Sequence, residues 1–266
     1  MEALLGRKPS FEVVGDVAVL EDPDEEAAAA IMAVHRNVHA VISPLSAVEG
    51  EFRTRRFCTV AGEARTATVH REHGLRYRVD LERAYFTPRL GTERLRIANL
   101  VKPGEAAFDI FAGVGPFALL MAKRGARVVA VDKNPDAVRL LRENAALNRI
   151  EDIVILEADA ADLAEEYKNC ADRIIMNLPH TGHDFLGVAI RIAKKGGVVH
   201  YYAIAPEDDL FGRDTAFVEE AARASGVEVE IISRGVVRSY APHRYNIVID
   251  FRVEKPSKEA VAPASL

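Results

Sequence analysis

The sequence predicts an α/β protein in which a mostly parallel, seven-stranded sheet follows a small α/β domain. After residue 105, short apolar runs typical of strands alternate with longer stretches typical of helices, and the connections are short. The first apolar run ends at a glycine turn, Ala112-Gly113-Val114-Gly115-Pro116, which opens the next helix. The last two runs have no helical stretch between them, so we expect these two strands to pair antiparallel.

The larger predicted domain covers residues 84–254. Its first helix is expected at 91–100 and is ended by Lys102-Pro103-Gly104. The strands are expected at 106–111, 127–132, 153–158, 172–177, 197–204, 227–237 and 245–253. The remaining helices are expected at 116–124, 135–148, 183–195 and 214–225. The tail, residues 255–266, contains two prolines and is expected to be disordered.

The small domain is expected to cover residues 1–83. Two short strands flank the Gly15-Asp16 turn, and a strand is predicted at 38–43. Between them, Asp22-Pro23 predicts a helix start, with the aspartate as the cap and the proline in the first turn.

The end of this domain is arginine-rich and leads into a linker. If the segment 50–56 is extended, Arg53 and Arg55 share one face. A hairpin is expected at 67–81, where His70 and His73 flank the turn and are predicted to be exposed loop residues rather than ligands. Residues 84–90 are predicted to be a linker, because Pro88 holds the residue before it in extended geometry.

Composition is typical of a soluble globular protein. Cys58 and Cys170 are not expected to form a structural disulfide, and no Cys/His cluster has metal-binding spacing. No apolar segment is long enough to span a membrane, and no signal peptide precedes the acidic residues near the start. We therefore expect a cytoplasmic protein without a metal.

The charge distribution allows two interpretations. The net charge of −5 counts mildly against a nucleic-acid partner, but a whole-chain charge is a poor guide when one face is basic. Arginines gather in the N-terminal third, namely Arg53, Arg55, Arg56, Arg71, Arg76, Arg78, Arg83, Arg89, Arg94 and Arg96. This crowding indicates either contact with a phosphate backbone or merely solvated strand and helix faces.

The glycine turn predicts a nucleotide-binding half. Glycine lets a backbone approach a ligand closely, and the following helix offers free N–H groups. Asp132 ends the next strand about 20 residues past the turn, where a carboxylate can accept hydrogen bonds from a ribose. Pro116 removes a donor that a pyrophosphate needs, which disfavours a nicotinamide cofactor. The alternative is a glycine turn in a fold that binds no nucleotide.

Other strand ends carry further candidates, because ligands bind at the carboxyl ends of strands in such sheets. Asp159 could accept from an adenine amino group or simply cap the next helix. Asn177-Leu178-Pro179 ends the fourth strand and resembles the N/D-P-P-Y element of methyltransferases that act on ring or amino nitrogens. The resemblance implies that Asn177 positions a target nitrogen, and the alternative is a turn without a catalytic role. His200-Tyr201-Tyr202 could line the pocket or pack in the core.

Several sequence blocks carry a resemblance to a known family. The segment D-x-F-A-G-x-G-P-F (109–117) resembles the cofactor loop of class I, Rossmann-like S-adenosylmethionine methyltransferases. The blocks GEFRTRR (50–56), YFTPRLGTERLRI (85–97), IMNLPHTGHDFL (175–186) and VRSYAPHRYNIVIDF (237–251) are similar, in order, to archaeal and eukaryotic tRNA (guanine-N1) methyltransferases. The resemblance covers nearly the whole chain, from Phe11 to Val253.

The resemblance implies a reaction and its partners. It implies methyl transfer from S-adenosylmethionine to N1 of the guanosine just 3′ of the anticodon, tRNA position 37. The expected partner is therefore the tRNA anticodon loop, and we expect a monomer. Many family members begin with a separate domain that reads the tRNA elbow, and this domain is expected to be absent here.

The resemblance also implies roles for particular residues. Glu93 would be the base at guanine N1, Arg53 would stabilise negative charge on O6, and Asn177 with Pro179 would hold and shape the base pocket. The implied cofactor-binding residues are Asp109, Phe111, Ala112, Gly113, Gly115, Pro116, Asp132, Lys133, Asp159, Ala160 and Asn177. The implied substrate-binding residues are Arg55, Tyr85 and Arg89. From the residues alone, Glu93 could merely favour its helix N-terminus and Arg53 could be a surface residue.

Alternative functions remain open at this point. A wybutosine-pathway aminocarboxypropyl transferase shares this layout. That family has a histidine in place of the loop proline, lacks the N-L-P element and lacks P-R-L in its linker. Pro116, Asn177, Pro179 and Pro88-Arg89-Leu90 favour methyl transfer. A small-molecule methyltransferase, another RNA methyltransferase and an RNA-binding module without catalysis are further alternatives. Whether imidazoguanosine derivatives are also substrates is left open by the sequence.

Overall fold

The computed structural model describes residues 9–47 and 50–256, which form two compact units. The first unit contains the chain up to Leu95 together with two later segments, Gly113–Pro116 and Asn134–Glu151. The second unit contains Arg96–Ala112, Phe117–Lys133 and the chain from Asp152 onward. The domain limits predicted from the sequence stay a prediction. The predicted disorder of the tail concerns residues that lie almost entirely outside the described part.

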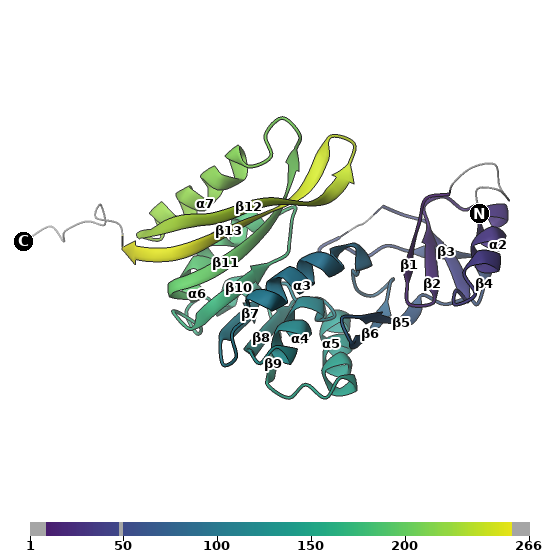
Figure 1. Cartoon of the computed structure of the whole chain (residues 1–266), viewed down its shortest axis with the longest axis horizontal. Helices are drawn as coiled ribbons and strands as arrows, with labels where there is room; N and C mark the ends of the chain where they lie inside the picture. Colours follow the sequence, from purple (N-terminus) through teal and green to yellow (C-terminus); the bar gives the residue numbers. More distant parts are fainter. Residues whose placement is uncertain (1–8, 48–49, 257–266) are drawn as a thin grey trace, which may run out of the picture. The chain divides into compact units, whose positions relative to one another are not determined.

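The N-terminal part of the first unit is a four-stranded sheet with one helix (Figure 1). The strands pair in the order β1 (Phe11–Val14), β2 (Val17–Leu20), β3 (Ala40–Pro44) and β4 (Phe57–Gly62), and only β2 and β3 run parallel. Helix α2 (Glu25–Val34) buries Ala27, Ala28 and Ile31 in a core with residues of β2 and β3. The two strands around the Gly15 turn and the strand near residue 40 are therefore confirmed.

The predicted cap of helix α2 was wrong by two residues. Asp24, not Asp22, is the N-cap, because its backbone is extended and its Oδ1 accepts from the backbone N–H of Ala27 at 2.9 Å. Glu25 and Glu26 then occupy the first turn, where they favour the positive end of the helix.

The rest of the first unit joins a hairpin to a helix from later in the chain. Strands β5 (Ala67–Glu72) and β6 (Leu75–Asp80) turn at His73 and Gly74, both with positive φ, as a two-residue hairpin requires. On α5 (Pro135–Leu147), Asn144 Oδ1 accepts from Arg78 N at 2.6 Å and Asn144 Nδ2 donates to Arg78 O at 3.1 Å. Asn148, which caps α5, makes the same pair of bonds to the backbone of Arg76. Two amide side chains thus satisfy the free edge of β6.

Residues 84–90 form the predicted connection, and Thr87 before Pro88 is extended as expected, but much of the segment is buried. Ala84, Phe86, Thr87 and Leu90 are all less than 9% exposed. The segment ends in the 3₁₀ turn η1 (Pro88–Leu90), which leads directly into α3 (Gly91–Leu100). Buried apolar side chains therefore fix the entry to this helix, which begins in the first unit and ends in the second.

The second unit is built on a seven-stranded sheet with the order β12-β13-β11-β10-β7-β8-β9 (Figure 1). Its strands are β7 (Ala106–Asp109), β8 (Arg127–Asp132), β9 (Ile153–Glu157), β10 (Ala171–Met176), β11 (Ala193–Pro206), β12 (Val227–Ala241) and β13 (Arg244–Pro256). All pairs are parallel except those of β13 with β11 and β12. The predicted mostly parallel sheet with an antiparallel end is confirmed.

Helices connect these strands with one departure from the prediction. Helices α4 (Pro116–Lys123) and α7 (Gly212–Ala224) lie between strands as expected. A short 3₁₀ helix, η2 (Ala160–Leu163), follows β9. The helix predicted at 183–195 is instead a 3₁₀ turn, η3 (Gly182–Phe185), followed by α6 (Leu186–Ile192). Helix α6 ends earlier than predicted because Ala193 is extended and begins β11, where it pairs with Ala171 of β10.

The strand order indicates which edge of the sheet is the candidate ligand-binding site. β7 lies between β8 and β10, so the chain moves outward from β7 through β8 to β9 and then crosses back to β10. Such a reversal leaves a crevice at the carboxyl ends of the central strands, where ligands bind in open α/β sheets. The core beneath this edge contains Phe108, Met176, Tyr201 and Phe251, each less than 4% exposed.

Candidate functional site

Three predicted residues end neighbouring strands of the second unit. Asp109 closes β7, Asp132 closes β8, and Asn177 directly follows β10. Asp109 is paired in register with Ala130 of β8 and Ile175 of β10. The fold therefore brings all three to one edge of the sheet, as the strand-end argument predicted.

Asp109 has an unusual electrostatic environment. It is 1% exposed, and burial, together with the nearby charge of Asp132, raises its pKa to about 7. The backbone N–H groups of Phe111 and Ala118 point toward the carboxyl and limit this rise. Neither carboxylate oxygen accepts a well-formed hydrogen bond from the described residues. A buried carboxylate of this kind would be satisfied by a cationic donor such as an ammonium group.

The glycine turn after β7 has the backbone that the sequence predicted. Gly113 and Gly115 have φ of +55° and +91°, in the left-handed region that favours glycine. A Cβ at Gly113 would meet only the carbonyl oxygen of Tyr85, at 3.8 Å, so backbone conformation rather than space requires glycine. Pro116 is the first residue of α4.

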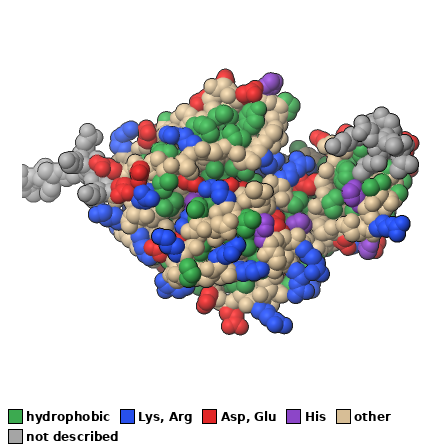
Figure 2. Space-filling model, in the orientation of Figure 1, with side chains coloured by type: hydrophobic (Ala, Val, Ile, Leu, Met, Phe, Trp, Pro, Cys, Tyr) green, Lys and Arg blue, Asp and Glu red, His purple; other side chains and the backbone are tan. Residues whose placement is uncertain are grey.

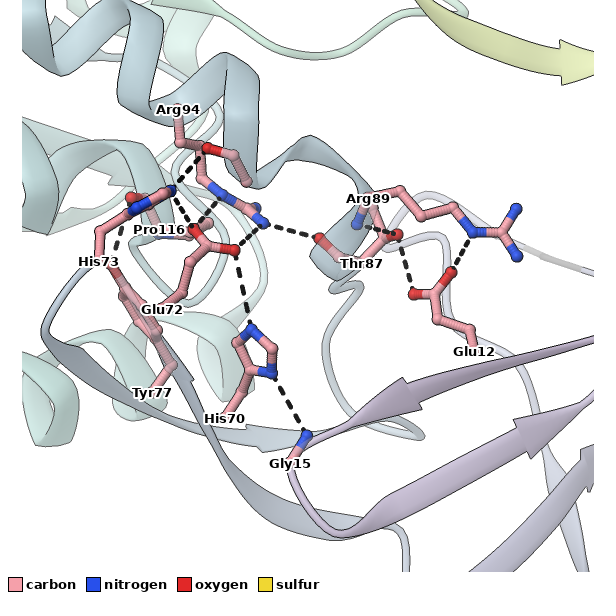
Figure 3. A network of polar contacts seen from close by, with 11 residues as sticks. Glu12, Gly15, His70, Glu72, His73, Tyr77, Thr87, Arg89, Arg94 and Pro116 are labelled. Atoms are coloured by element: carbon pink, nitrogen blue, oxygen red, sulfur yellow. Dashed lines mark hydrogen bonds and ion pairs between the residues drawn. The ribbon is translucent and has the colours of Figure 1, made fainter. Parts of the chain in front are cut away.

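Side chains of the first unit hold this turn. Asn144 Nδ2 donates to the carbonyl of Val114 at 3.0 Å. The hydroxyl of Tyr77, from β6, donates to the carbonyl of Pro116 at 3.4 Å (Figure 3). Tyr77 is fully buried, and burial raises its pKa, so it stays protonated as a donor. The predicted cofactor turn is thus fixed by two donors that the sequence did not reveal.

Asp159 is a helix cap. Its Oδ1 accepts from Ala161 N at 2.9 Å at the start of η2, and its Oδ2 pairs with Lys133 Nζ at 3.0 Å. The hydrogen bond from the backbone N–H of Ala161 lowers the pKa of Asp159 most, and the bond from Lys133 lowers it further. Of the two interpretations, capping is observed. The cofactor contacts of Lys133, Asp159 and the buried Ala160 stay a prediction.

The N-L-P loop is held by its own backbone. Leu178 O accepts from Gly182 N at 2.7 Å, and Pro179 O accepts from Ile204 N at 3.1 Å. Asn177 is half-buried, and its side-chain amide bonds to no other described residue. An amide positioned at the strand end by a fixed loop can present its oxygen to a ligand.

His200, Tyr201 and Tyr202 are core residues, each at most 1% exposed. Arg173 Nη1 donates to His200 Nε2 at 2.7 Å, and His200 Nδ1 donates to Asp250 Oδ1 at the same distance. Burial lowers the pKa of His200 despite this carboxylate, so the ring stays neutral. All three pack in the core, and Tyr201 also lines a small cavity of the second unit.

In the first unit, a predicted catalytic residue lies against a predicted substrate-binding residue. The guanidinium of Arg53 lies over the ring of Tyr85, 5.7 Å from its centroid, and Tyr85 is 41% exposed. The segment around Arg53 is a turn with φ of +54°, and Arg53 N donates to Gly50 O at 3.3 Å. The argument that Arg53 and Arg55 share a face of an extended strand was therefore wrong. Arg55 is half-buried.

Glu93 lies in the first turn of α3 and is 8% exposed. The neighbouring Arg94 is 2% exposed and makes two bonds of 2.8 Å to the carboxylate of Glu72, from β5 (Figure 3). Arg94 Nη2 also donates to the carbonyl of Thr87 at 2.9 Å. This buried ion pair fixes the turn of α3 that carries Glu93.

Two histidines complete the same network, contrary to the prediction that they are exposed. His70 Nδ1 accepts from Gly15 N at 3.3 Å, and its Nε2 lies 3.7 Å from Glu72 (Figure 3). His73 Nε2 donates to the carbonyl of Gly91 at 2.8 Å. Burial opposes ionisation of Glu72, but His70 and Arg94 outweigh it and lower its pKa.

Arg89 is tied to the first strand. Its Nε lies 2.5 Å from Glu12 Oε2, and Thr87 Oγ1 donates to Glu12 Oε1 at 2.9 Å (Figure 3). About half of the Arg89 side chain is exposed, so its guanidinium can still reach a ligand.

The surface in view carries charges of both signs (Figure 2). Figure 2 shows Lys and Arg side chains interspersed with acidic ones on the face in view. Among the described residues, no group of three or more His, Cys, Asp or Glu side chains could hold a metal ion. None of the described helices is both long and apolar enough to cross a membrane.

Comparison with known proteins identifies relatives along most of the chain. The model of the TRM5/TYW2 methyltransferase domain matches residues 68–231. The tRNA (guanine(37)-N(1))-methyltransferase Trm5b of Pyrococcus abyssi is 46% identical over 250 residues, which cover 92% of this chain and 74% of the relative. The tRNA(Phe) (4-demethylwyosine(37)-C(7)) aminocarboxypropyltransferase of Pyrococcus horikoshii is 35% identical over 192 residues, which cover 71% of this chain and 68% of the relative.

Solved structures agree with these relatives. The crystal structure of P. abyssi Trm5b superposes with a TM-score of 0.84 at 45% identity, covering 92% of this chain and 75% of that chain. The complex structure of aTrm5 and tRNALeu superposes with a TM-score of 0.79 at 35% identity, covering 92% of this chain and 72% of that chain. The crystal structure of Methanocaldococcus jannaschii TYW2 in complex with AdoMet superposes with a TM-score of 0.74 at 25% identity, covering 92% of this chain and 100% of that chain. The match of the domain model over more than half of the chain, together with these identities, shows that the chain belongs to the TRM5/TYW2 methyltransferase family.

Proposed function

We propose that this protein transfers the methyl group of S-adenosylmethionine to N1 of guanosine 37 in tRNA, next to the anticodon. The observation that carries the proposal is the 46% identity, over 92% of the chain, to a protein named for this reaction. The aminocarboxypropyltransferase relative is less similar, at 35% over 71% of the chain. Pro116 and the Asn177-Leu178-Pro179 loop favour methyl transfer over the alternative.

The second unit has residues that fit this cofactor. When bound, S-adenosylmethionine supplies a methyl group activated by its positively charged sulfur. The buried carboxylate of Asp109, without a well-formed hydrogen bond in the described part, suits the ammonium of the methionine moiety. Asp132, at the end of the next strand, suits the ribose hydroxyls. Gly113 and Gly115 have no side chain, so a ligand can approach the backbone of this turn closely.

The first unit carries the groups that guanine chemistry requires. N1 of guanine bears a proton and is a poor nucleophile, and loss of that proton moves negative charge onto O6. Glu93 is the base that takes the proton from N1, and Arg53 is the cation that stabilises O6. Arg53 is held over the Tyr85 ring, which limits the positions of its guanidinium. Asn177 holds the base through its side-chain amide.

The proposed partner is the anticodon loop of tRNA. The related aTrm5 was solved in complex with tRNALeu, which supports tRNA as the partner. The target base must leave its stack to reach the methyl group, and the half-exposed Tyr85 ring offers a surface for it. Arg55 and Arg89 are proposed phosphate contacts. We further propose that the protein acts as a monomer in the cytoplasm.

Product mass tests the reaction directly. The protein is incubated with unmodified tRNA and S-adenosylmethionine, and the digested nucleosides are analysed by mass spectrometry. The proposal predicts 1-methylguanosine. A parallel incubation uses tRNA with 4-demethylwyosine at position 37, the base named for the aminocarboxypropyltransferase relative. An aminocarboxypropyl group on that tRNA would assign the second function. Binding of both tRNAs without modification of either would leave only an RNA-binding role.

A further inference from the structure

A small cavity in the second unit lies beside the N-L-P loop. Its volume is about 180 Å³. Residues from the loop and η3, the end of β11, the first turns of α7 and the start of β13 line it. Pro179 forms part of its wall and follows Asn177 by two residues, so the Cα atoms of these two residues are at most about 7 Å apart.

One wall presents a fixed guanidinium. Arg213 Nη2 donates to Asp214 Oδ2 at 2.9 Å and to the carbonyl of Ile204 at 3.1 Å. Asp214 is 2% exposed and accepts from the hydroxyl of Tyr201 at 2.8 Å. Burial raises the pKa of Tyr201, so this hydroxyl stays a donor. The remaining N–H groups of Arg213 donate to no other residue in the described part of the chain, so they are oriented and available to an acceptor.

A second guanidinium supplies net positive charge. Asp214 already neutralises Arg213, but Arg244 is exposed and forms no ion pair within residues 9–47 and 50–256. Three exposed carboxylates lie near this wall but do not line the cavity, namely Asp184, Glu207 and Asp209. Asp209 accepts from the backbone N–H groups of Gly212 and Arg213, and Glu207 pairs with His243. Two guanidiniums against one buried carboxylate favour an anion with several acceptor oxygens, such as a phosphodiester.

Flat rings border the same cavity. His183 and Phe217 are stacked, with centroids 4.9 Å apart and planes 16° apart. On the loop side, His180 Nε2 lies 3.2 Å from the hydroxyl of Tyr240. Guanidinium groups beside aromatic rings are typical of sites that bind single-stranded nucleotides. The guanidinium pairs with the phosphate, and the base stacks on the ring.

We propose that this cavity binds the nucleotide next to the target guanosine, with its phosphate between Arg213 and Arg244 and its base against the His183–Phe217 pair. The proposal rests on the proposed function, because it needs the target base at Asn177. It adds a second nucleotide subsite, built from α7 and β13, that holds the unpaired loop while the target base is extruded. An acidic peptide fits less well, because it does not pair each anionic group with an aromatic base as a nucleotide does.

The first test compares two arginine variants. Arg244→Ala removes the unpaired guanidinium, and Arg223→Ala removes an exposed arginine from the last turn of α7, away from the cavity. Affinity for full-length unmodified tRNA is measured at several salt concentrations. We expect Arg244→Ala to weaken binding roughly tenfold and to lower the slope of log affinity against log salt by about 1. Arg223→Ala should match the wild type in both quantities.

The second test locates the phosphate. Anticodon stem-loop RNAs carry a single neutral methylphosphonate at one of the linkages that flank the target guanosine. The wild type should lose affinity at one of these linkages, and Arg244→Ala should be insensitive to the same change. Equal sensitivity of both proteins, or a wild-type salt slope in Arg244→Ala, would overturn the proposal.

A methylation assay separates this inference from the proposed function. If the wild type does not methylate guanosine 37, the proposed function is wrong. If the wild type methylates it and the two arginine variants bind and methylate alike, only the second subsite is wrong. Thermal unfolding of each variant, expected within a few degrees of the wild type because both residues are exposed, excludes misfolding as the cause.

Discussion

Replacing Arg94 by alanine should destabilise the protein strongly. The guanidinium is 2% exposed and makes two bonds to Glu72 and one to the carbonyl of Thr87 (Figure 3). Its removal leaves the Glu72 carboxylate, whose side chain is 9% exposed, without its main counter-charge. Breaking a buried pair by removing one partner costs about 3–5 kcal/mol, because the other charge stays buried and unpaired.

An exposed arginine of the same unit is the matched control. Arg139 on α5 also pairs with two carboxylates, Glu143 and Asp136, but its side chain is 53% exposed. Ion pairs of this kind contribute about 0–1 kcal/mol. Arg139→Ala should therefore change the free energy of unfolding by less than about 1 kcal/mol.

Urea denaturation followed by circular dichroism measures both variants. The expected order is wild type, then Arg139→Ala close to it, then Arg94→Ala far below. The double variant Glu72→Leu/Arg94→Leu should recover part of the loss, because no unpaired charge remains, although the carbonyl of Thr87 still lacks its donor. If Arg94→Ala were no less stable than Arg139→Ala, the buried pair would not hold the start of α3.

Three further predictions concern the cofactor and the base. Asp109→Asn should remove a pH dependence of stability. The pKa of Asp109 is raised to about 7 in the folded state, so the free energy of unfolding of the wild type decreases as the pH rises from about 4 to 7. Urea denaturation of the variant should show no such decrease. Glu93→Gln should slow single-turnover methyl transfer by roughly 10²–10⁴-fold while tRNA affinity stays unchanged, and normal turnover would remove Glu93 as the base. Asp132→Ala should lose affinity for S-adenosylmethionine in calorimetry, with its fold intact by circular dichroism.

The strand pattern of the second unit could be predicted because parallel strands covered on both faces are continuous apolar runs. β8 (Arg127–Asp132) is predicted to the residue for this reason. The Gly113 and Gly115 turn was also predictable, because its positive φ angles restrict the residue type. β4 was missed, since FCTVAG shows no clean alternation of buried and exposed positions.

The supporting contacts of the site could not be predicted. Glu72 and Arg94 are 22 residues apart and follow no periodic pattern, so only the tertiary fold reveals that they pair. The arginine cluster was a weak signal for Arg94, and Glu72 gave none. His70 and His73 were placed on the surface because composition alone cannot show that a hairpin turn is covered. The positive φ of Arg53 was equally hidden, since it occurs at a residue type that rarely adopts it.

The most direct measurement is methyl transfer from labelled S-adenosylmethionine to two unmodified tRNA transcripts that differ only at position 37, with guanosine in one and adenosine in the other. The account predicts label in the guanosine transcript alone, recovered after digestion as 1-methylguanosine. Label in both transcripts, or in neither while S-adenosylmethionine still binds, would contradict it.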